Sequence, residues 1–272
     1  MNTVTQTTQM LKTLSVMKEA IAAGLDKGLR SNSGMSGGNA YKMKSLIDSG
    51  RIEDNVFNRA AAYALATAET NACMGKIVAA PTAGASAVLP AVLIAAAEKH
   101  NIDDEKVADA LYLAGEIGMR IAKAASLSGA ECGCQAECGS AAAMAAAGMV
   151  YLMDGTFEQS ENAAALALKS LLGLVCDPVA GLVEVPCVKR NANCTSIAIT
   201  SANMSLAGIE SVIPFDEVIA AMKQIGRSMP AELKETAQGG CAATVTGMRI
   251  ARSFGLKQRR EDDTGTFVRD ST

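Results

Sequence analysis

The sequence has very few aromatic residues and a single histidine. Its 272 residues include no tryptophan, four tyrosines and five phenylalanines. A core built from this chain must therefore be filled by alanine, leucine, isoleucine, valine and methionine, and alanine lets helices pack closely. The one histidine, His100, lies in the polar sequence EKHNID, where we expect an exposed helix end. The chain therefore shows no Ser-His or Cys-His pair for nucleophilic catalysis.

The chain also lacks any concentration of positive charge. Its formal net charge is −3, its pI is about 5.4, and no basic stripe is present. Nucleic-acid phosphates require clustered lysine and arginine, so we expect no nucleic-acid partner. The N-terminal sequence MNTVTQTTQMLKTLSVMKEA has no long apolar run with a small-residue cleavage site after it. It does not resemble a secretion signal, and a cytoplasmic location is predicted.

Only one uncharged stretch, residues 77–97, is long enough to be weighed as a membrane span. It is rich in alanine and is interrupted by Pro81, Gly84 and Pro90. These breaks favour a loop followed by a buried helix, with a kink or a delayed start at Pro90. We therefore expect no membrane segment.

Apolar residues recur at helical spacing along almost the whole chain, and no alternating segment longer than residues 181–185 indicates a strand. Helices are predicted over residues 6–27, 54–78, 103–128, 136–153, 158–174, 192–207, 215–227 and 240–254. One further helix is predicted to begin near residue 39, and another, after residue 86, to end near residue 99. Residues 136–153 are nearly all alanine, methionine and glycine, which predicts a central helix that is buried on all sides. The sequence thus predicts an all-α protein with one multi-helix domain over residues 1–256 and irregular loops that carry cysteines. Residues 257–272 are polar and are predicted to form a disordered tail.

The chain has eight cysteines, and five of them fall in two short stretches. The stretches are GAECGCQAECGS at residues 129–140 and LLGLVCDPVAGLVEVPCVKRN at residues 171–191. In a reducing compartment, clustered thiols are more often metal ligands or catalytic groups than disulfides. From spacing alone, the compact set Cys132, Cys134 and Cys138 is the obvious ligand group, although buried structural thiols explain the pattern equally well.

Two loops rich in glycine and serine, residues 31–38 and 80–86, are candidate substrate-binding segments. Backbone N–H groups in such loops can bind a carboxylate, although ordinary caps and turns account for either loop taken alone. The residues that we assign to substrate binding are Ser36, Gly37, Gly38, Thr82, Gly84 and Ala85.

Four motifs, in this order, resemble the alpha subunit of the iron–sulfur L-serine dehydratase family. They are SGGNAYKM from Ser36, PTAGAS from Pro81, GCQAE from Gly133 and CDPVAGLVEVPCVKRN from Cys176. The resemblance covers about residues 30–250 and implies a [4Fe–4S] cluster held by Cys134, Cys176 and Cys187, with one iron open for substrate. This implied ligand set replaces the compact set of Cys132, Cys134 and Cys138. The remaining thiols, whose roles it does not assign, are Cys73, Cys132, Cys138, Cys194 and Cys241.

The resemblance implies that L-serine loses water to give aminoacrylate, which hydrolyses to pyruvate and ammonia without pyridoxal phosphate. It also implies that both glycine-rich loops contact the substrate and that the cluster is sensitive to oxygen. No base for the Cα proton can be identified in the chain. Two-subunit members of the family carry a further domain on a separate beta subunit, so we expect such a partner.

Two alternatives remain open at this point. The same elimination could act on L-threonine or L-cysteine, since one methyl group changes binding by only about 1–3 kcal/mol. The chain could instead be a non-catalytic helical scaffold that is stabilised by zinc or thiols.

Three charged residues beside the cysteines are also interpreted. Asp177 is predicted to orient its loop through an Asx turn, with proton transfer as the alternative. Lys189 and Arg190 could bind a carboxylate, but solvated charges are the preferred interpretation and they are left unassigned.

Overall fold

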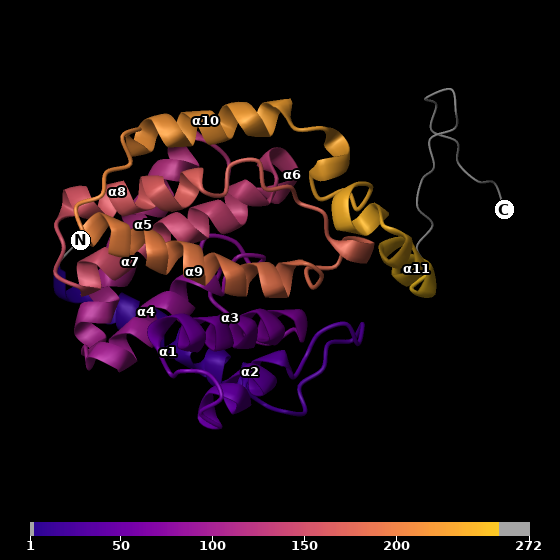
Figure 1. The fold of residues 1–272 in the computed structure, drawn as a ribbon, viewed down its shortest axis with the longest axis horizontal. Coiled ribbons are helices and arrows are strands. Elements are labelled where there is room, and N and C mark those ends of the chain that lie inside the picture. Colours follow the sequence, from indigo (N-terminus) through magenta and orange to yellow (C-terminus); the bar gives the residue numbers. More distant parts are fainter. Residues whose placement is uncertain (1–2, 256–272) are drawn as a thin grey trace.

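Helices make up most of the structure, a computed structural model that describes residues 3–255 (Figure 1). The α-helices are α1 Thr3–Gly24, α2 Asn39–Asp48, α3 Val56–Ala72, α4 Val88–His100, α5 Asp104–Ala124, α6 Gly129–Cys132, α7 Ser140–Leu152, α8 Phe157–Lys169, α9 Cys187–Leu206, α10 Phe215–Ser228 and α11 Val245–Ser253. Shorter turns are η1 Gln135–Gly139, η2 Val179–Gly181, η3 Ala231–Leu233 and η4 Gly240–Ala243. Residues 3–255 contain no β-strand, which confirms the all-α prediction. The predicted tail lies outside the described residues.

Polar side chains at the helix starts explain where several helices begin. The side chain of Asn55 accepts the N–H of Asn58 at the start of α3, and Asp103 accepts the N–H of Lys106 at the start of α5. At the start of α8, Thr156 and Gln159 form a capping box, in which the side chain of each residue accepts the backbone N–H of the other. Each side chain satisfies a backbone donor that has no partner within its helix, so the first turn is stabilised locally.

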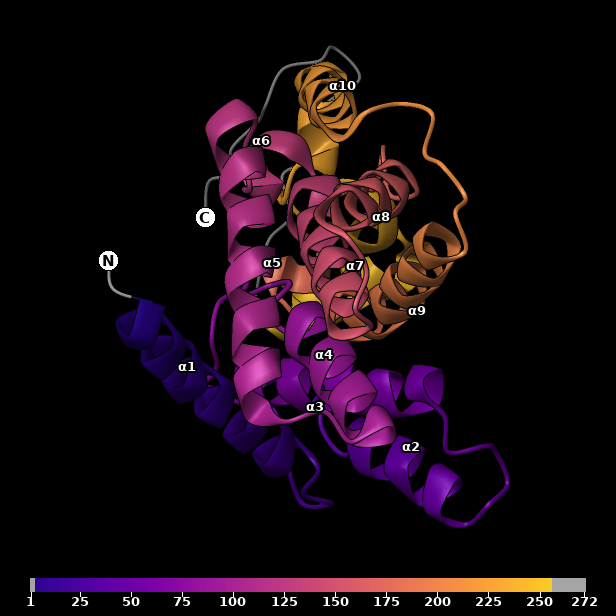
Figure 2. The same ribbon diagram turned by 90° about the vertical axis from the view of Figure 1, so that its left-hand side faces the viewer.

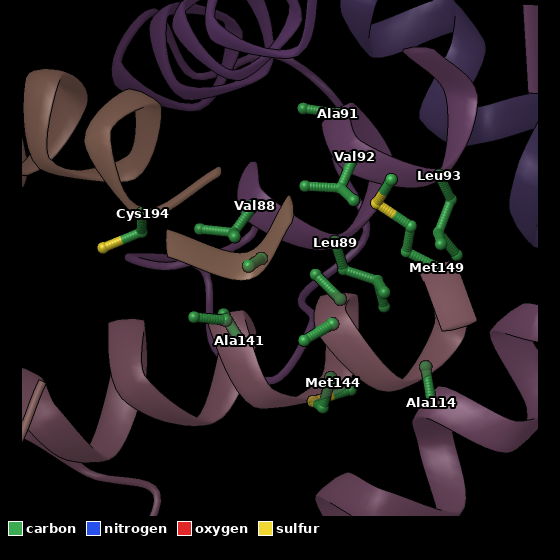
Figure 3. Close-up of a cluster of buried hydrophobic side chains, with 14 of the residues drawn as sticks. Val88, Leu89, Ala91, Val92, Leu93, Ala114, Ala141, Met144, Met149 and Cys194 are labelled. Atoms are coloured by element: carbon green, nitrogen blue, oxygen red, sulfur yellow. The ribbon is translucent and has the colours of Figure 1, made fainter. Parts of the chain in front are cut away.

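Helix α7 occupies the centre of the bundle, with α4, α5, α8 and α9 packed around it (Figure 2). Every residue of α7 except Tyr151 is buried. Figure 3 shows side chains of α4, including Val88 and Leu89, beside Ala141 and Met144 of α7. The alanines leave little side-chain volume between the axes, so the helices come close together. The prediction of a central, buried, alanine-rich helix is confirmed.

The uncharged stretch over residues 77–97 is a loop followed by a buried helix, as predicted. All residues from 88 to 97 in α4 are buried. Pro90 is the third residue of α4, a position whose N–H has no intrahelical partner, and it therefore neither kinks nor delays the helix. Within the described part of the chain, no helix has the length and apolarity needed to cross a membrane.

Several helix ends differ from the prediction, and two differences matter for function. The predicted helix over 136–153 is preceded by a π-helix, Gln135–Gly139, and α9 begins at Cys187 rather than near residue 192. Other helices stop early: α3 at Ala72, α5 at Ala124 and α8 at Lys169. Periodicity alone overestimated these ends because small and apolar residues continue into the loops that follow.

Three segments that lie far apart in the sequence meet at one end of the bundle. Figure 1 shows α6, the start of α9 and the chain after α10 at this end. Cys176 donates its N–H to the oxygen of Leu233 at 2.9 Å and accepts the N–H of Glu235 at 2.8 Å. Helix α11 packs on η2 in a small separate core of Val179, Ala180 and Ala251. The cysteine-bearing segments are thus enclosed by the chain that follows α10.

A candidate cysteine-lined metal centre

Cys134 is held between α6 and the π-helix by contacts with the segment that leads to Cys176. Gly133 has a φ of 72°, and a Cβ there would lie 2.9 Å from the oxygen of Leu174, so this close approach requires glycine. The backbone N–H of Gln135 donates to the same Leu174 oxygen at 2.9 Å, and its side-chain oxygen accepts the N–H of Gly173 at 2.9 Å. The π-helix, a type that is frequent at functional sites, therefore positions Cys134 firmly.

Cys187 is positioned by the first turn of α9. Asn191, one turn along, donates its side-chain N–H to the oxygens of Cys187 at 3.0 Å and Gly84 at 2.8 Å. Its side-chain oxygen accepts the N–H of Ala87 at 3.3 Å. One buried amide therefore connects a predicted ligand to the second glycine-rich loop.

The fold brings Cys134, Cys176 and Cys187 to one region. The side chains of Cys134 and Cys176 are buried, and that of Cys187 is partly buried. Burial, and after it the charge of Cys134, raises the pKa of Cys187 to about 12 and raises that of Cys176 further. Negative charge on one of these thiols therefore opposes ionisation of the other two. A bound cation would relieve this repulsion, so the donor set fits a thiolate-ligated metal group.

The three thiols are not arranged around a single ion. No group of three histidine, cysteine, aspartate or glutamate side chains in the described residues is placed to hold one metal ion. A cubane cluster makes a different demand, since each cysteine binds a different iron and the sulfurs stay further apart. Three cysteine thiols match the donor set of a cluster with one open iron, whereas a tetrahedral zinc site would need a fourth ligand.

The neighbouring cysteines occupy three different environments. Cys138 lies behind Cys134, with their sulfurs 3.3 Å apart, and Cys194 lies next to Cys138. Cys132 instead packs against Gly226 of α10, where any side chain would overlap it. The compact set suggested by spacing is therefore not assembled around one centre, because Cys132 faces a different helix from Cys134 and Cys138.

Glu137 is a functional candidate to which the sequence pattern assigned no role. Its Oε1 accepts a hydrogen bond of 2.7 Å from the hydroxyl of Thr82, and its Oε2 lies 4.0 Å from the sulfur of Cys176. Burial raises the pKa of this carboxyl group. Glu137 is the only residue from 132 to 140 that is not buried. A lone charge in an apolar run beside a candidate ligand was the available sequence signal.

Space for the Glu137 carboxylate depends on two glycines. A Cβ at Gly129 would lie 2.6 Å from Oε2 of Glu137 and 3.0 Å from the sulfur of Cys176, and a Cβ at Gly84 would lie 3.1 Å from Oε1. The absence of side chains at these positions leaves the carboxylate beside the cysteines. The motif glycines therefore have a steric role here in addition to any role of their N–H groups.

The first glycine-rich loop is anchored by a fully buried carboxylate. Glu69 of α3 accepts the backbone N–H groups of Gly37 at 3.0 Å, Asn39 at 3.0 Å and Ala40 at 3.2 Å. The N–H of Gly37, predicted to meet the substrate, is thus directed at a carboxylate of the protein itself. The hydroxyl of Ser36 is buried and makes no hydrogen bond within the described residues. Gly38 is the N-cap of α2 with a φ of 73°.

Glu184 links this first loop to the cysteine region. Its buried carboxylate accepts hydrogen bonds of 2.7 Å from the hydroxyls of Ser31 and Ser33. Glu184 lies between the predicted ligands Cys176 and Cys187 in the sequence. Glu184 therefore connects the loop over residues 31–38 to the segment between two predicted ligands.

The second glycine-rich loop contacts the centre directly. The hydroxyl of Thr82 donates to Glu137, and the oxygen of Gly84 accepts from Asn191. The side chain of Ala85 is completely buried in the core. Of the three loop residues assigned to the substrate, Thr82 and Gly84 lie beside Glu137, and the buried side chain of Ala85 anchors the loop in the core.

Asp177 and Arg190 form a buried ion pair next to Cys176. Their side chains are 3% and 16% exposed, with 3.1 Å between Oδ1 and Nη2. The other Asp177 oxygen accepts the N–H of Cys241 at 2.7 Å. The Asx turn predicted for Asp177 does not form, because the N–H of Val179 donates to Val185 and the Asp177 carboxylate instead holds Arg190 and the N–H of Cys241. The preferred interpretation of Arg190 as a solvated charge was wrong, because α9 starts before it and turns it inward. Lys189 is exposed, as is His100 at the end of α4.

Comparison with known proteins identifies the family. The family model described as "Serine dehydratase alpha chain" matches residues 2–242. This chain belongs to the serine dehydratase alpha-chain family. The resemblance inferred from the four motifs is therefore confirmed at the level of the family.

Individual relatives agree with this assignment. The chain is 52% identical over 247 residues to the probable L-serine dehydratase alpha chain of Bacillus subtilis. The matched region covers 90% of this chain and 82% of that protein. It is 49% identical over 221 residues to the L-serine dehydratase alpha chain of Peptoniphilus asaccharolyticus, with 81% and 76% covered. The L-serine dehydratase of Streptomyces coelicolor is 44% identical over 191 residues, but only 41% of its length is matched.

Proposed function

We propose that this chain is the alpha subunit of an iron–sulfur L-serine dehydratase, which converts L-serine to pyruvate and ammonia. The observation that carries the proposal is the convergence of Cys134, Cys176 and Cys187 beside Glu137 and the Thr82 loop in a member of this family. The names of the relatives from Bacillus subtilis and Peptoniphilus asaccharolyticus support the substrate.

Cys134, Cys176 and Cys187 are proposed to hold a [4Fe–4S] cluster. Such a group, when bound, would supply an open iron as a Lewis acid for the serine hydroxyl, so that no pyridoxal cofactor is needed. The thiols come from the residue before the π-helix, an irregular segment and the first turn of α9, so they connect separate parts of the fold. Metal binding is therefore expected to be coupled to the order of this end of the bundle.

Glu137 and the two glycine-rich loops are proposed to bind and orient the substrate. The carboxylate of Glu137 is the anionic group beside Cys176, and we place the α-ammonium group of serine against it. Thr82 fixes the orientation of that carboxylate. Backbone N–H groups of the loops, other than that of Gly37, which donates to Glu69, are proposed to receive the substrate carboxylate, with the Ser36 hydroxyl as a further donor.

A separate beta subunit is proposed to complete the enzyme. Support comes from the alpha-chain names of the relatives and from the Streptomyces coelicolor protein, of which this chain matches only 41%. The Cα proton requires a base, and the partner is the proposed source of that group. A cytoplasmic location agrees with a site built from reduced thiols.

Two other functions are tested alongside serine dehydration. The same elimination could favour L-threonine or L-cysteine, and turnover of the three amino acids compares them directly. The zinc-stabilised scaffold has less support, because the described residues offer no three-ligand site for a single ion.

The deciding experiment uses protein purified without oxygen, with and without a co-expressed beta subunit. Iron, sulfide, zinc and pyruvate from L-serine are measured for the wild type and Cys176→Ala. We expect about four irons per chain in the wild type, as in a cubane cluster, and loss of both iron and activity in the variant. Zinc alone, or no metal and no turnover beside the partner, would refute the proposal.

A further inference from the structure

Arg190 connects the segments that carry two of the predicted cluster ligands, Cys176 and Cys187. It lies three residues after Cys187, on the same side of α9. Its Nη1 donates to the oxygen of Val175 at 2.9 Å, and its Nη2 donates to Oδ1 of Asp177 at 3.1 Å. These two residues flank Cys176. The positive charge of the guanidinium group also interacts electrostatically with Cys134.

The environment of Arg190 makes this arrangement unlike a surface ion pair. The Arg190 side chain is only 16% exposed, and its carboxylate partner Asp177 is 3% exposed. Asp177 is held in turn by the N–H of Cys241. A buried guanidinium costs desolvation energy unless several partners compensate it. Here one planar group donates to a carbonyl and a carboxylate at once, an arrangement that suits its rigid fork of donors better than a lysine ammonium.

The chemistry of the proposed ligands explains why a cation would be buried there. Three thiolates bring three negative charges into a site that is largely shielded from water. The fixed positive charge of Arg190, which interacts with Cys134, opposes their mutual repulsion and would stabilise the reduced, more negative cluster. No other arginine or lysine has a hydrogen bond or ion pair to the segments of Cys176 and Cys187 within the described interactions.

We propose that Arg190 is the positioning residue of the metal centre: it aligns the segments of Cys176 and Cys187, and its fixed positive charge raises the reduction potential of the bound cluster. The inference rests on the proposed cluster but not on the identity of the amino-acid substrate. Arg190 is not proposed to bind the substrate carboxylate, because its Nη1 and Nη2 donate to Val175 and Asp177.

The test compares Arg190→Met, Arg190→Gln and Arg190→Lys with Lys189→Met. Lys189 is the adjacent, exposed residue of the same helix turn, so its variant removes an equal charge without entering the site. Each protein is reconstituted without oxygen, and iron and sulfide per chain, the cluster reduction potential and the rate of iron loss to a chelator are measured. Helical content by circular dichroism establishes that each variant is folded.

We expect Arg190→Met and Arg190→Gln to lower the reduction potential and to weaken iron retention about 10- to 100-fold, the usual effect of losing an outer-shell partner. Arg190→Lys keeps the charge and should restore the potential in part, while iron retention stays weakened. Lys189→Met should match the wild type. If Arg190→Met does not fold, Arg190→Gln decides, since its amide can still donate to Val175.

Three results would overturn the inference. The first is wild-type potential and iron retention in the folded Arg190→Gln protein. The second is an equal effect of Lys189→Met, which would indicate a general charge effect. The third is a raised KM for serine with an unchanged potential, which would assign Arg190 to substrate binding. If the wild type itself binds no cluster, the proposed function fails first and this inference fails with it.

Discussion

The hydroxyl of Thr82 donates a 2.7 Å hydrogen bond to Oε1 of Glu137, 55 residues further along the chain. This contact joins the second glycine-rich loop to the π-helix that follows Cys134. It turns the other carboxylate oxygen toward Cys176, at 4.0 Å. A loop recognised only by its small residues thus orients the one acidic group beside the predicted ligands.

Glu137→Gln should reduce activity more than it reduces cluster binding. The amide keeps the shape and a hydrogen-bond acceptor but loses the charge that faces the substrate ammonium. Hydrogen bonds to charged groups contribute about 1.5–3 kcal/mol, so kcat/KM for L-serine should fall roughly 10- to 150-fold. Steady-state kinetics with iron analysis on the same samples would check this. Equal activity in the variant would remove Glu137 from the site, and Thr82→Ser, which keeps the hydroxyl, should stay close to the wild type.

Gly129→Ala should disturb the centre, because its methyl group would lie 2.6 Å from Glu137 and 3.0 Å from the Cys176 sulfur. We expect lower iron content and lower activity than in the wild type. Gly115→Ala in α5 is the matched control, since nothing lies within 4 Å of a Cβ there. The control should keep its iron and become more stable by up to about 1 kcal/mol, because alanine favours the helix. Similar iron loss in both variants would contradict the steric explanation.

Glu69→Gln should destabilise the first glycine-rich loop. The Glu69 carboxylate accepts the N–H groups of Gly37, Asn39 and Ala40, and an amide would place a donor against some of them. We expect the free energy of unfolding to fall by about 1–3 kcal/mol, the usual penalty for unsatisfied buried donors. Urea unfolding would measure it against Glu116→Gln, an exposed residue of α5 that should change little. An unchanged midpoint for Glu69→Gln would show that the loop does not depend on this anchor.

Cysteine variants should separate the three ligands from the thiols behind them. Cys134→Ala, Cys176→Ala and Cys187→Ala are expected to lose most of their iron and their visible absorbance. Cys138→Ala should retain both, although its sulfur lies only 3.3 Å from that of Cys134, because Cys138 interacts with Cys194 and, unlike Cys134, is not among the charges that act on Cys176 and Cys187. Iron retained in Cys187→Ala but lost in Cys138→Ala would instead indicate that the ligands are the compact cysteine group that contains Cys134 and Cys138.

Exposure to air should inactivate the enzyme as its cluster is lost. A cluster with three protein ligands keeps one iron without a cysteine, and that iron is the one most open to oxidation. We expect activity and visible absorbance to fall together, and to return together after anaerobic treatment with iron and sulfide. Full activity after prolonged exposure, with the absorbance gone, would contradict a catalytic cluster.

Local signals predicted most of the helices, because they depend on near neighbours. Asn55 and Asp103 cap helices at the predicted starts, and the alanine-rich run forms the central α7. Predicted helix ends were less accurate. Helix α9 begins at Cys187, because the irregular segment before it is held by contacts with Leu233 and Glu235 that no local pattern contains.

The sequence by itself determined the all-helical class, the family motifs and the two glycine-rich loops, since periodicity, caps and motif order lie within short stretches of chain. Only the tertiary structure decided which polar groups meet. Glu69 accepts the N–H of Gly37, Glu137 faces Cys176, and Arg190 joins the segments of Cys176 and Cys187. These pairings depend on how distant helices pack, and burial gives the charges energies that their positions in the sequence do not reveal.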